Sequence, residues 1–325
     1  MTTLLKAKIS IEFILLITFF TSAVVLGQES EYENINEIKK ERTLGGHYFT
    51  PNNTIRSPFI LTYVKTALGV GQINDLLFPL IKVGNKELLI VQGDIFVALL
   101  NIEYQHAVKD WLAAYIQFGL IGRLGSDTGT LVIHGVNYAT QFDIGWMIKV
   151  FRDDKFALST TVEISNGKYS FINIQNFVNQ LIREDQLTSI ITFNNSLYGV
   201  WGIKAAYGFN HFIGLNLLAN LGYGETIQRQ LENKWFTILG LNADMNLTKI
   251  INAPVSFSLG YLYNSYPKNN NDVVFNNNIV IAQLNYIGRS NIVLSLEFSF
   301  SRELAGDDVK TIWLNTQRFK IKYIF

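Results

Sequence analysis

The stretch RFKIKYIF, residues 318–325, decides how the rest of the sequence is interpreted. Side chains of an extended strand alternate between its two faces. One face here is apolar and consists of Phe319, Ile321, Tyr323 and Phe325. The other face is cationic and consists of Arg318, Lys320 and Lys322. In a soluble antiparallel sheet the apolar face would cover a core, whereas in a transmembrane barrel it would meet lipid and the charged face would line the lumen.

Composition favours the transmembrane arrangement. The chain has 325 residues, of which 48% are hydrophobic and 13% aromatic, but only 16% are charged. Ordinary soluble domains have roughly a quarter of their residues charged, so much of this surface is expected not to face water. Basic residues number 27 and acidic residues 26, a balance that gives no indication of nucleic-acid binding. The absence of cysteine excludes a disulfide framework and a thiolate zinc site.

Residues 1–27 have the layout of a secretory signal peptide. Lys6 and Lys8 precede an apolar run, and the small residue Gly27 closes it. We expect cleavage before Gln28 and export of the mature chain, with an uncleaved anchor as the alternative. No later segment has the run of about 18 apolar residues that a membrane helix needs. An exported chain that resides in a membrane must then do so as a closed β-barrel.

From residue 59 onward the sequence alternates in the manner of barrel strands. In 138–151, for example, apolar residues such as Ile144 and Trp146 alternate with residues such as Asp143. The pattern predicts an all-β fold, a transmembrane antiparallel β-barrel of about twelve strands, an even number as in single-chain bacterial barrels. The predicted strands are 59–69, 92–106, 110–123, 138–151, 155–166, 197–208, 212–223, 235–247, 254–263, 278–287, 291–301 and 312–325.

The connections between these strands alternate in length. Those after the even-numbered strands are short, whereas those after the odd-numbered strands are long. Barrels of the bacterial outer membrane have short periplasmic turns and long extracellular loops. The alternation therefore places both ends of the barrel on the periplasmic side. The long connections are 70–91, 124–137, 167–196, 224–234, 264–277 and 302–311.

The ending of the chain resembles the C-terminal targeting strand of bacterial outer-membrane β-barrel proteins, which closes on an aromatic residue preceded by alternate apolar residues. The resemblance implies residence in the outer membrane, contact with outer-membrane lipid, and insertion by the outer-membrane assembly machinery. It covers the architecture of 59–325 and implies nothing about a solute. The matching residues, which would form the assembly signal, are Phe319, Ile321, Tyr323 and Phe325.

The predicted organisation is a signal peptide at 1–27, a periplasmic leader at 28–58 and a transmembrane barrel at 59–325. The leader is polar and charged, so we expect it to be solvated; a plug inside the lumen is the alternative. Within the long connections, 171–184 has the spacing of an amphipathic helix. The apolar stretch 73–82 is expected to fold back over or into the barrel mouth.

The predicted inward face is polar, as a water-filled channel requires. Opposite charges that pair across a narrow interior would instead close it. The three basic residues of the last strand form a possible basic ladder, and channels that select anions use such groups. The charged residues predicted to line the lumen and to set selectivity are Glu103, Asp143, Lys149, Glu163, Lys204, Asp244, Glu297, Arg318, Lys320 and Lys322.

Catalytic and metal-binding patterns are not apparent. None of the four histidines has a serine or carboxylate at a spacing that would assemble a nucleophile and its base. No metal motif such as HExxH occurs. We therefore predict no catalytic residues, no cofactor and no metal site, and expect that the protein is not an enzyme.

The favoured hypothesis is a porin-like outer-membrane channel of the Gram-negative type, which passes small polar or amphiphilic solutes. The alternative is a structural or adhesive outer-membrane barrel, with a closed lumen and external loops that bind partners. The sequence specifies neither the solute nor an oligomeric state.

Overall fold

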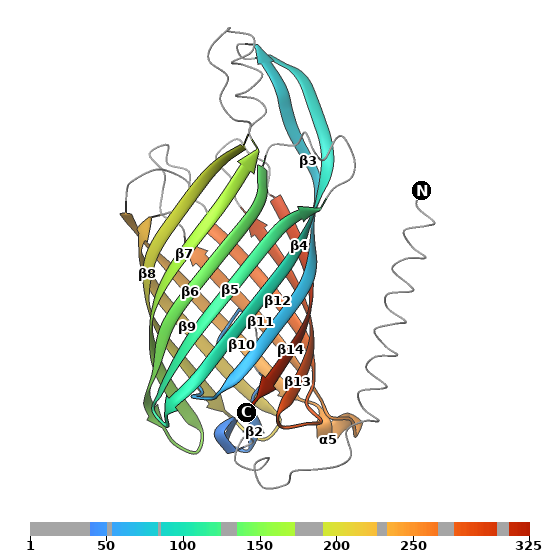
Figure 1. Ribbon diagram of the computed structural model, residues 1–325. Coiled ribbons are helices and arrows are strands. Elements are labelled where there is room, and N and C mark those ends of the chain that lie inside the picture. Colours follow the sequence, from blue (N-terminus) through green and yellow to red (C-terminus); the bar gives the residue numbers. More distant parts are fainter. Residues whose placement is uncertain are drawn as a thin grey trace.

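The computed structural model describes residues 40–50, 54–83, 86–124, 135–172, 191–225, 233–265, 276–303 and 312–325. Twelve antiparallel strands form a closed barrel, in which each strand pairs with its neighbours in sequence and the last pairs with the first (Figure 1). This confirms the predicted fold class and strand number. The strands are β3 (Tyr63–Val83), β4 (Lys86–Lys109), β5 (Leu112–Leu124), β6 (Gly135–Arg152), β7 (Phe156–Ile172), β8 (Ile191–Gly208), β9 (Ile213–Glu225), β10 (Asn233–Asn246), β11 (Val255–Ser265), β12 (Asn276–Tyr286), β13 (Ile292–Glu303) and β14 (Ile312–Ile324).

The alternation in sequence becomes an apolar exterior and a polar interior. On β6, Ile144 and Trp146 are each 50% exposed, whereas Asp143, which precedes Ile144, is buried. Leu68, Val162 and many other large apolar side chains are likewise exposed on the outside. Soluble monomers seldom expose such continuous apolar surface, whereas a transmembrane barrel presents it to hydrocarbon. Among the described residues, no helix has the length and hydropathy needed to span a bilayer.

The short turns and the C-terminus lie at one end of the barrel, which we call the short-turn end (Figure 1). The β10–β11 turn there contains the single helical turn α5 (Thr248–Ile251). The opposite end, where the longer connections begin, is the long-loop end. These connections, and most of the helix predicted at 171–184, fall outside the described residues.

The connection predicted at 70–91 differs from the structure. Backbone pairing between β3 and β4 continues from Leu76 and Gly93 to Val83 and Lys86, with register shifts along the way. The resulting hairpin extends beyond the barrel at the long-loop end (Figure 1). The stretch 73–82 thus belongs to β3, because continuing the ladder satisfies its backbone hydrogen-bonding groups.

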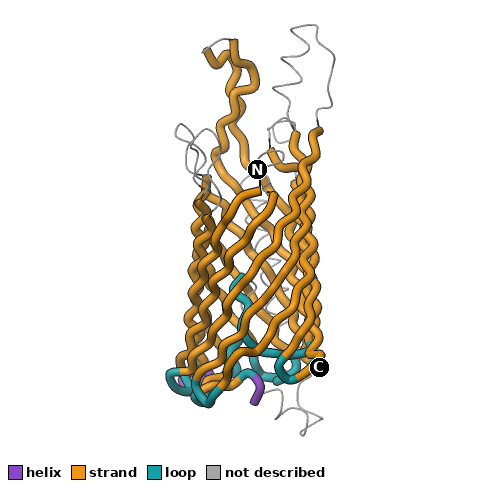
Figure 2. Tube along the Cα trace, turned by 90° about the vertical axis from the view of Figure 1, so that its left-hand side faces the viewer, coloured by secondary structure: helices purple, strands orange, loops and turns teal. Residues whose placement is uncertain are grey.

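The described residues that precede β3 lie at the short-turn end and inside the barrel. A small two-stranded sheet of β1 (Thr43–Leu44) and β2 (His47–Tyr48) is followed by a loop that rises inside the lower lumen (Figure 2). We call residues 40–50 and 54–62 the plug. The prediction of a solvated leader at 28–58 is wrong for 40–50 and 54–58, since Leu44, Phe49 and Ile55 are each only 1% exposed. A polar segment can be solvated by water or can form hydrogen bonds with the polar side chains of the lumen. Its composition therefore does not distinguish the two environments. The strand predicted at 59–69 begins only at Tyr63.

Candidate functional site: the plugged lumen

Apolar side chains of the plug pack against the barrel wall in three places. Near the short-turn end, Phe49 and Phe59 belong to a buried cluster with Ile324 of β14. Ile60 packs with Tyr115 and Met147 on β5 and β6. Farther up the lumen, Ile55 packs against the wall of β9 and β11, where its neighbours are Leu218 and Leu262. The plug therefore contacts widely separated strands of the barrel.

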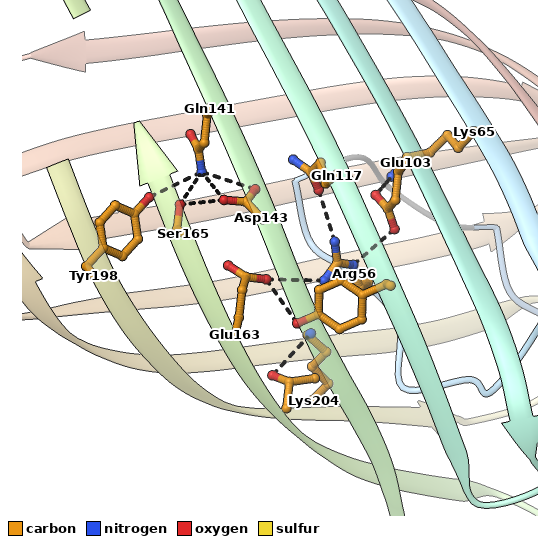
Figure 3. Close-up of polar contacts among 12 residues, drawn as sticks. Arg56, Lys65, Glu103, Gln117, Gln141, Asp143, Glu163, Ser165, Tyr198 and Lys204 are labelled. Atoms are coloured by element: carbon orange, nitrogen blue, oxygen red, sulfur yellow. Dashed lines mark hydrogen bonds and ion pairs between the residues drawn. The ribbon is translucent and has the colours of Figure 1, made fainter. Parts of the chain in front are cut away.

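Arg56 is the most highly coordinated charge of the plug (Figure 3). Its Nε donates to Glu103 Oε1 of β4 at 3.1 Å, and its Nη2 donates to Gln117 of β5 at 3.0 Å. Its Nη1 lies 3.5 Å from Glu163 Oε2 of β7. The guanidinium also lies over the Tyr115 ring, 3.9 Å from the centroid. Arg56 of the plug thus contacts three strands of the barrel, β4, β5 and β7.

Glu103 is the carboxylate on which this cluster depends. It is 1% exposed, and it accepts hydrogen bonds from Tyr63 and Lys65 as well as from Arg56. A buried carboxylate requires such compensation, because desolvation disfavours its charged form. Two cations and a phenol supply it here.

A second polar attachment joins Thr50 of the plug to β10. Asp244 Oδ2 accepts from the Thr50 backbone N–H at 2.6 Å and from its hydroxyl at 2.5 Å. Asn285 donates to the Thr50 hydroxyl oxygen at 3.2 Å, and Ser256 Oγ lies 3.0 Å from it. His47 Nε2 is 3.8 Å from Asp244 Oδ1, but burial lowers the pKa of His47 to about 4. The imidazole is therefore neutral at pH 7, and Thr50 supplies the direct hydrogen bonds that Asp244 accepts.

Thr50→Val is expected to loosen the plug without changing its size much. The substitution removes the hydroxyl shared by Asp244, Asn285 and Ser256, and leaving buried polar groups unpaired costs about 1–3 kcal/mol. Tryptic cleavage after Arg56 measures release of the plug, because cleavage needs an open form. A rise of roughly tenfold or more is expected, since about 1.4 kcal/mol is tenfold. Thr50→Ser, which keeps the hydroxyl, is the matched control; equal cleavage of the two variants would contradict the assignment.

Charged residues of the barrel wall belong to two further polar groups. On β13 and β14, Lys320 Nζ donates to Glu297 Oε2 at 2.6 Å and also to Gln283, whereas Arg318 Nη1 lies 3.8 Å from Glu297 Oε1. On β6 and β7, Asp143 accepts from Ser165 and from Gln141, the latter at 2.9 Å (Figure 3).

The charged residues predicted to line the lumen are distributed between fully and partly buried positions. Lys149 makes no ion pair with another described residue, and Lys322 lies with its ammonium 3.3 Å from the Tyr63 ring centroid. Their role in selectivity remains a prediction. The partly buried residues are Lys149, Glu163 and Arg318. The buried residues are Glu103, Asp143, Lys204, Asp244, Glu297, Lys320 and Lys322.

The apolar residues at the C-terminus lie on the other face of β14. Ile321, Tyr323 and Phe325 are exposed on the outside, and Phe319 is half-buried. The backbone N–H of Phe325 donates to the carbonyl of Thr62 at 3.0 Å, next to the start of β3. Their role as an assembly signal also remains a prediction.

Sequence reasoning missed the plug residues that hold the lumen together. Arg56 and Thr50 lie in an irregular segment with no period-two pattern, and their partners follow 47 and 194 residues later. The charged residues predicted inside are five acidic and five basic, so their balance gave no indication of a further cation from the plug. Within the described ranges, no group of three or more histidine or carboxylate side chains gathers as metal ligands would.

Comparisons with known proteins give structural likeness at low identity. No family model matches the sequence, and no curated protein matches it. The translocator domain of autotransporter NalP from Neisseria meningitidis is 9% identical with a TM-score of 0.49, over 95% of this chain and 98% of that chain. An outer membrane channel from Pseudomonas putida F1 is 10% identical with a TM-score of 0.49, over 85% and 100%. The NanC porin is 10% identical with a TM-score of 0.47, over 81% and 98%. Neither a solute nor an activity follows from likeness at this level.

Proposed function

We propose that this chain is an outer-membrane channel for small polar or amphiphilic solutes, closed by its own plug and open when the plug leaves the lumen. The observation that carries the proposal is the position of Arg56. Its guanidinium is held inside the lumen by carboxylates from β4 and β7, on strands whose outer faces are apolar. The barrel wall thus supplies a polar interior, and a separate segment fills it.

The chemistry of this attachment suits a plug that can be released. The attraction within a buried ion pair is largely offset by the desolvation of its charges. When the plug leaves, water solvates Arg56, Glu103 and Glu163 again, so the net cost is much smaller than the gross attraction. A permanent filling of the lumen has no need for charges, because apolar packing stabilises an interior at least as well.

The exterior supports location in a membrane, and the predicted signal peptide and C-terminal pattern support the outer membrane. Exposed aromatic rings occur near both ends of the strands, as in the girdles of transmembrane barrels. Trp111 is 52% exposed at the short-turn end, and Trp235 and Trp313 are 62% and 55% exposed toward the long-loop end. In this arrangement the short-turn end faces the periplasm, and the outer-membrane assembly machinery inserts the chain.

Deletion of Phe325 is expected to reduce assembly in the outer membrane several-fold. The deletion removes the last aromatic residue of the proposed signal and the hydrogen bond from its backbone N–H to Thr62. The amount of barrel in isolated outer membranes is the measurement. Phe209→Ala, which removes another exposed aromatic ring at the short-turn end, is the control. Equal loss in both variants would indicate a general effect of lost apolar surface.

Single-channel conductance in a planar bilayer tests the proposed function. A variant lacking residues 40–58 is compared with the full mature chain after both are shown to be folded. The variant is expected to give stable conductance steps, whereas the full chain stays closed with rare openings. Silence from the folded variant would overturn the proposal.

A structural or adhesive barrel is the second candidate. It is favoured by the pairing of Glu297 with Lys320, because these wall residues satisfy each other within the barrel itself. If this function is correct, the lumen stays closed to ions when the plug is removed. The conductance experiment therefore separates the two functions.

A further inference from the structure

Arg318 of the β14 ladder is incompletely satisfied. Its Nη1 lies 3.8 Å from Glu297 Oε1, beyond hydrogen-bonding distance, while Lys320 takes the other oxygen of that carboxylate at 2.6 Å. Its Nε is buried and has no hydrogen-bond partner among the described residues, although 27% of the side chain remains accessible. A guanidinium offers five donors in a planar fork that matches a carboxylate. Arg318 can therefore accept an additional anionic partner.

Small residues of β3 lie beside the β14 ladder. The residue that pairs with Arg318 on β3 is Gly69, and Lys320 pairs with Ala67. A Cβ added at Gly69 would lie 2.7 Å from Arg318 Cγ, so only glycine permits this position of the side chain. The aliphatic part of Arg318 thus lies against the backbone of β3.

An apolar belt crosses the lumen wall toward the long-loop end from Arg318. Its members pair in one continuous register across β9 to β14, interrupted only by Gly240 and Ser301. On β14 the belt lies four residues from Arg318, about 13 Å along the strand at roughly 3.3 Å per residue. A lumen for purely polar solutes has no use for such a belt. Its apolar residues are Leu218, Leu262, Ile279 and Leu314.

Ile55 of the plug lies on the β9–β11 part of this belt. It packs against Leu218 and Leu262, and a Cβ added at Gly240 would lie 3.1 Å from Ile55 Cγ1. The closed state thus places an apolar side chain of the plug against apolar residues of the wall. Arg56, the next residue, lies on the opposite side with Glu103 and Glu163.

We propose that the solute is an amphiphilic carboxylate, whose apolar part replaces Ile55 on the belt and whose carboxylate pairs with Arg318. The proposal rests on the proposed function and names the solute class of that channel. Such a solute binds only when Ile55 has left, so it shifts the equilibrium toward the released plug in proportion to its concentration. The solute therefore opens its own channel. Neither a small hydrophilic anion nor a neutral apolar molecule satisfies both halves of the site.

The test uses release of the plug, measured without conductance. The chain has no cysteine, so Thr50→Cys introduces a single thiol, at a position that is fully buried in the closed state. Its reaction with a charged maleimide is followed in the presence of phenylbutyrate, acetate or phenylbutanol. At a concentration of about ten times Kd, phenylbutyrate is expected to accelerate labelling about tenfold. Acetate and phenylbutanol, at the same concentration, are expected to have little effect.

Arg318→Gln in the Thr50→Cys background tests the carboxylate partner. Losing a charge-assisted pair is expected to weaken the phenylbutyrate effect roughly tenfold or more. Lys168→Gln, which removes a charge exposed outside the lumen, is the matched control and is expected to keep the effect. Equal acceleration by phenylbutanol, or none by phenylbutyrate, overturns the proposal. The three probes on Thr50→Cys alone decide it if Arg318→Gln does not assemble.

The labelling experiment tests the solute class, and the conductance experiment tests the channel, so the two proposals can be rejected separately. Conductance of the plug-deleted barrel without accelerated labelling would leave the channel in place and reject the amphiphilic carboxylate. Accelerated labelling with a silent plug-deleted barrel would support the binding site and reject the channel.

Discussion

Glu103→Gln is expected to release the plug from the lumen. The substitution keeps the size of the side chain but removes the charge that compensates Arg56 and Lys65. Removing one partner of a buried ion pair costs about 3–5 kcal/mol, because the remaining charges stay desolvated. Tryptic cleavage after Arg56 is therefore expected to rise by more than about a hundredfold, since each 1.4 kcal/mol is a factor of ten.

Glu163→Gln provides a graded comparison for this result. Its carboxylate is farther from Arg56, at 3.5 Å, and 20% of its side chain is accessible to solvent. Partial solvation lowers the cost of losing the pair, so a smaller increase in cleavage is expected. An equal effect of both variants, or no effect of Glu103→Gln, would show that the Arg56 contacts do not hold the plug.

A disulfide between positions 50 and 256 is expected to keep the proposed channel closed. The Thr50 and Ser256 hydroxyl oxygens are 3.0 Å apart, so cysteine sulfurs in their place lie close to bonding distance. Because the chain has no other cysteine, Thr50→Cys with Ser256→Cys can form only this bond within one molecule. Openings in a planar bilayer are expected to disappear on oxidation and to return on reduction.

The two single-cysteine variants control for the substitutions themselves. Each lacks a bonding partner and is expected to open equally in oxidising and reducing buffer. Openings that persist in the fully oxidised double variant would mean that ions pass while Thr50 stays against β11. The plug would then not be the gate.

The barrel was predictable from sequence because two independent patterns coincide. Period-two alternation, as around Ile144 and Asp143, places strands, and the alternating connection lengths fix the order and direction of neighbours. The β3–β4 hairpin was missed, because apolar residues on both of its arms give no alternation between two faces. Its backbone pairing depends on two segments meeting, which neither segment alone reveals.

The lumen was predictable in its residue types but not in its contacts. Alternation identifies Glu103 and Glu297 as inward-facing, yet it cannot show that Glu103 meets a plug residue while Glu297 pairs within the wall. The plug itself was expected to be solvated, because its residues are polar and charged. Composition alone does not distinguish a segment that is exposed to water from one whose charges are buried with partners. Arg56 becomes recognisable only when closure of the barrel brings β4 and β7 to the same lumen.

The position of the plug before β3 has a consequence for the order of assembly. Tyr48 and Thr50 contact residues of the last third of the chain, at sequence separations of up to 242 residues. The plug is synthesised before these partners, so it has none of these contacts until the final strands have been synthesised. Contacts between such distant residues form slowly, because long chain segments must be ordered before they can form. An incomplete barrel therefore carries an uncovered plug with Phe49 and Phe59 exposed, a surface of the kind that holdase chaperones bind.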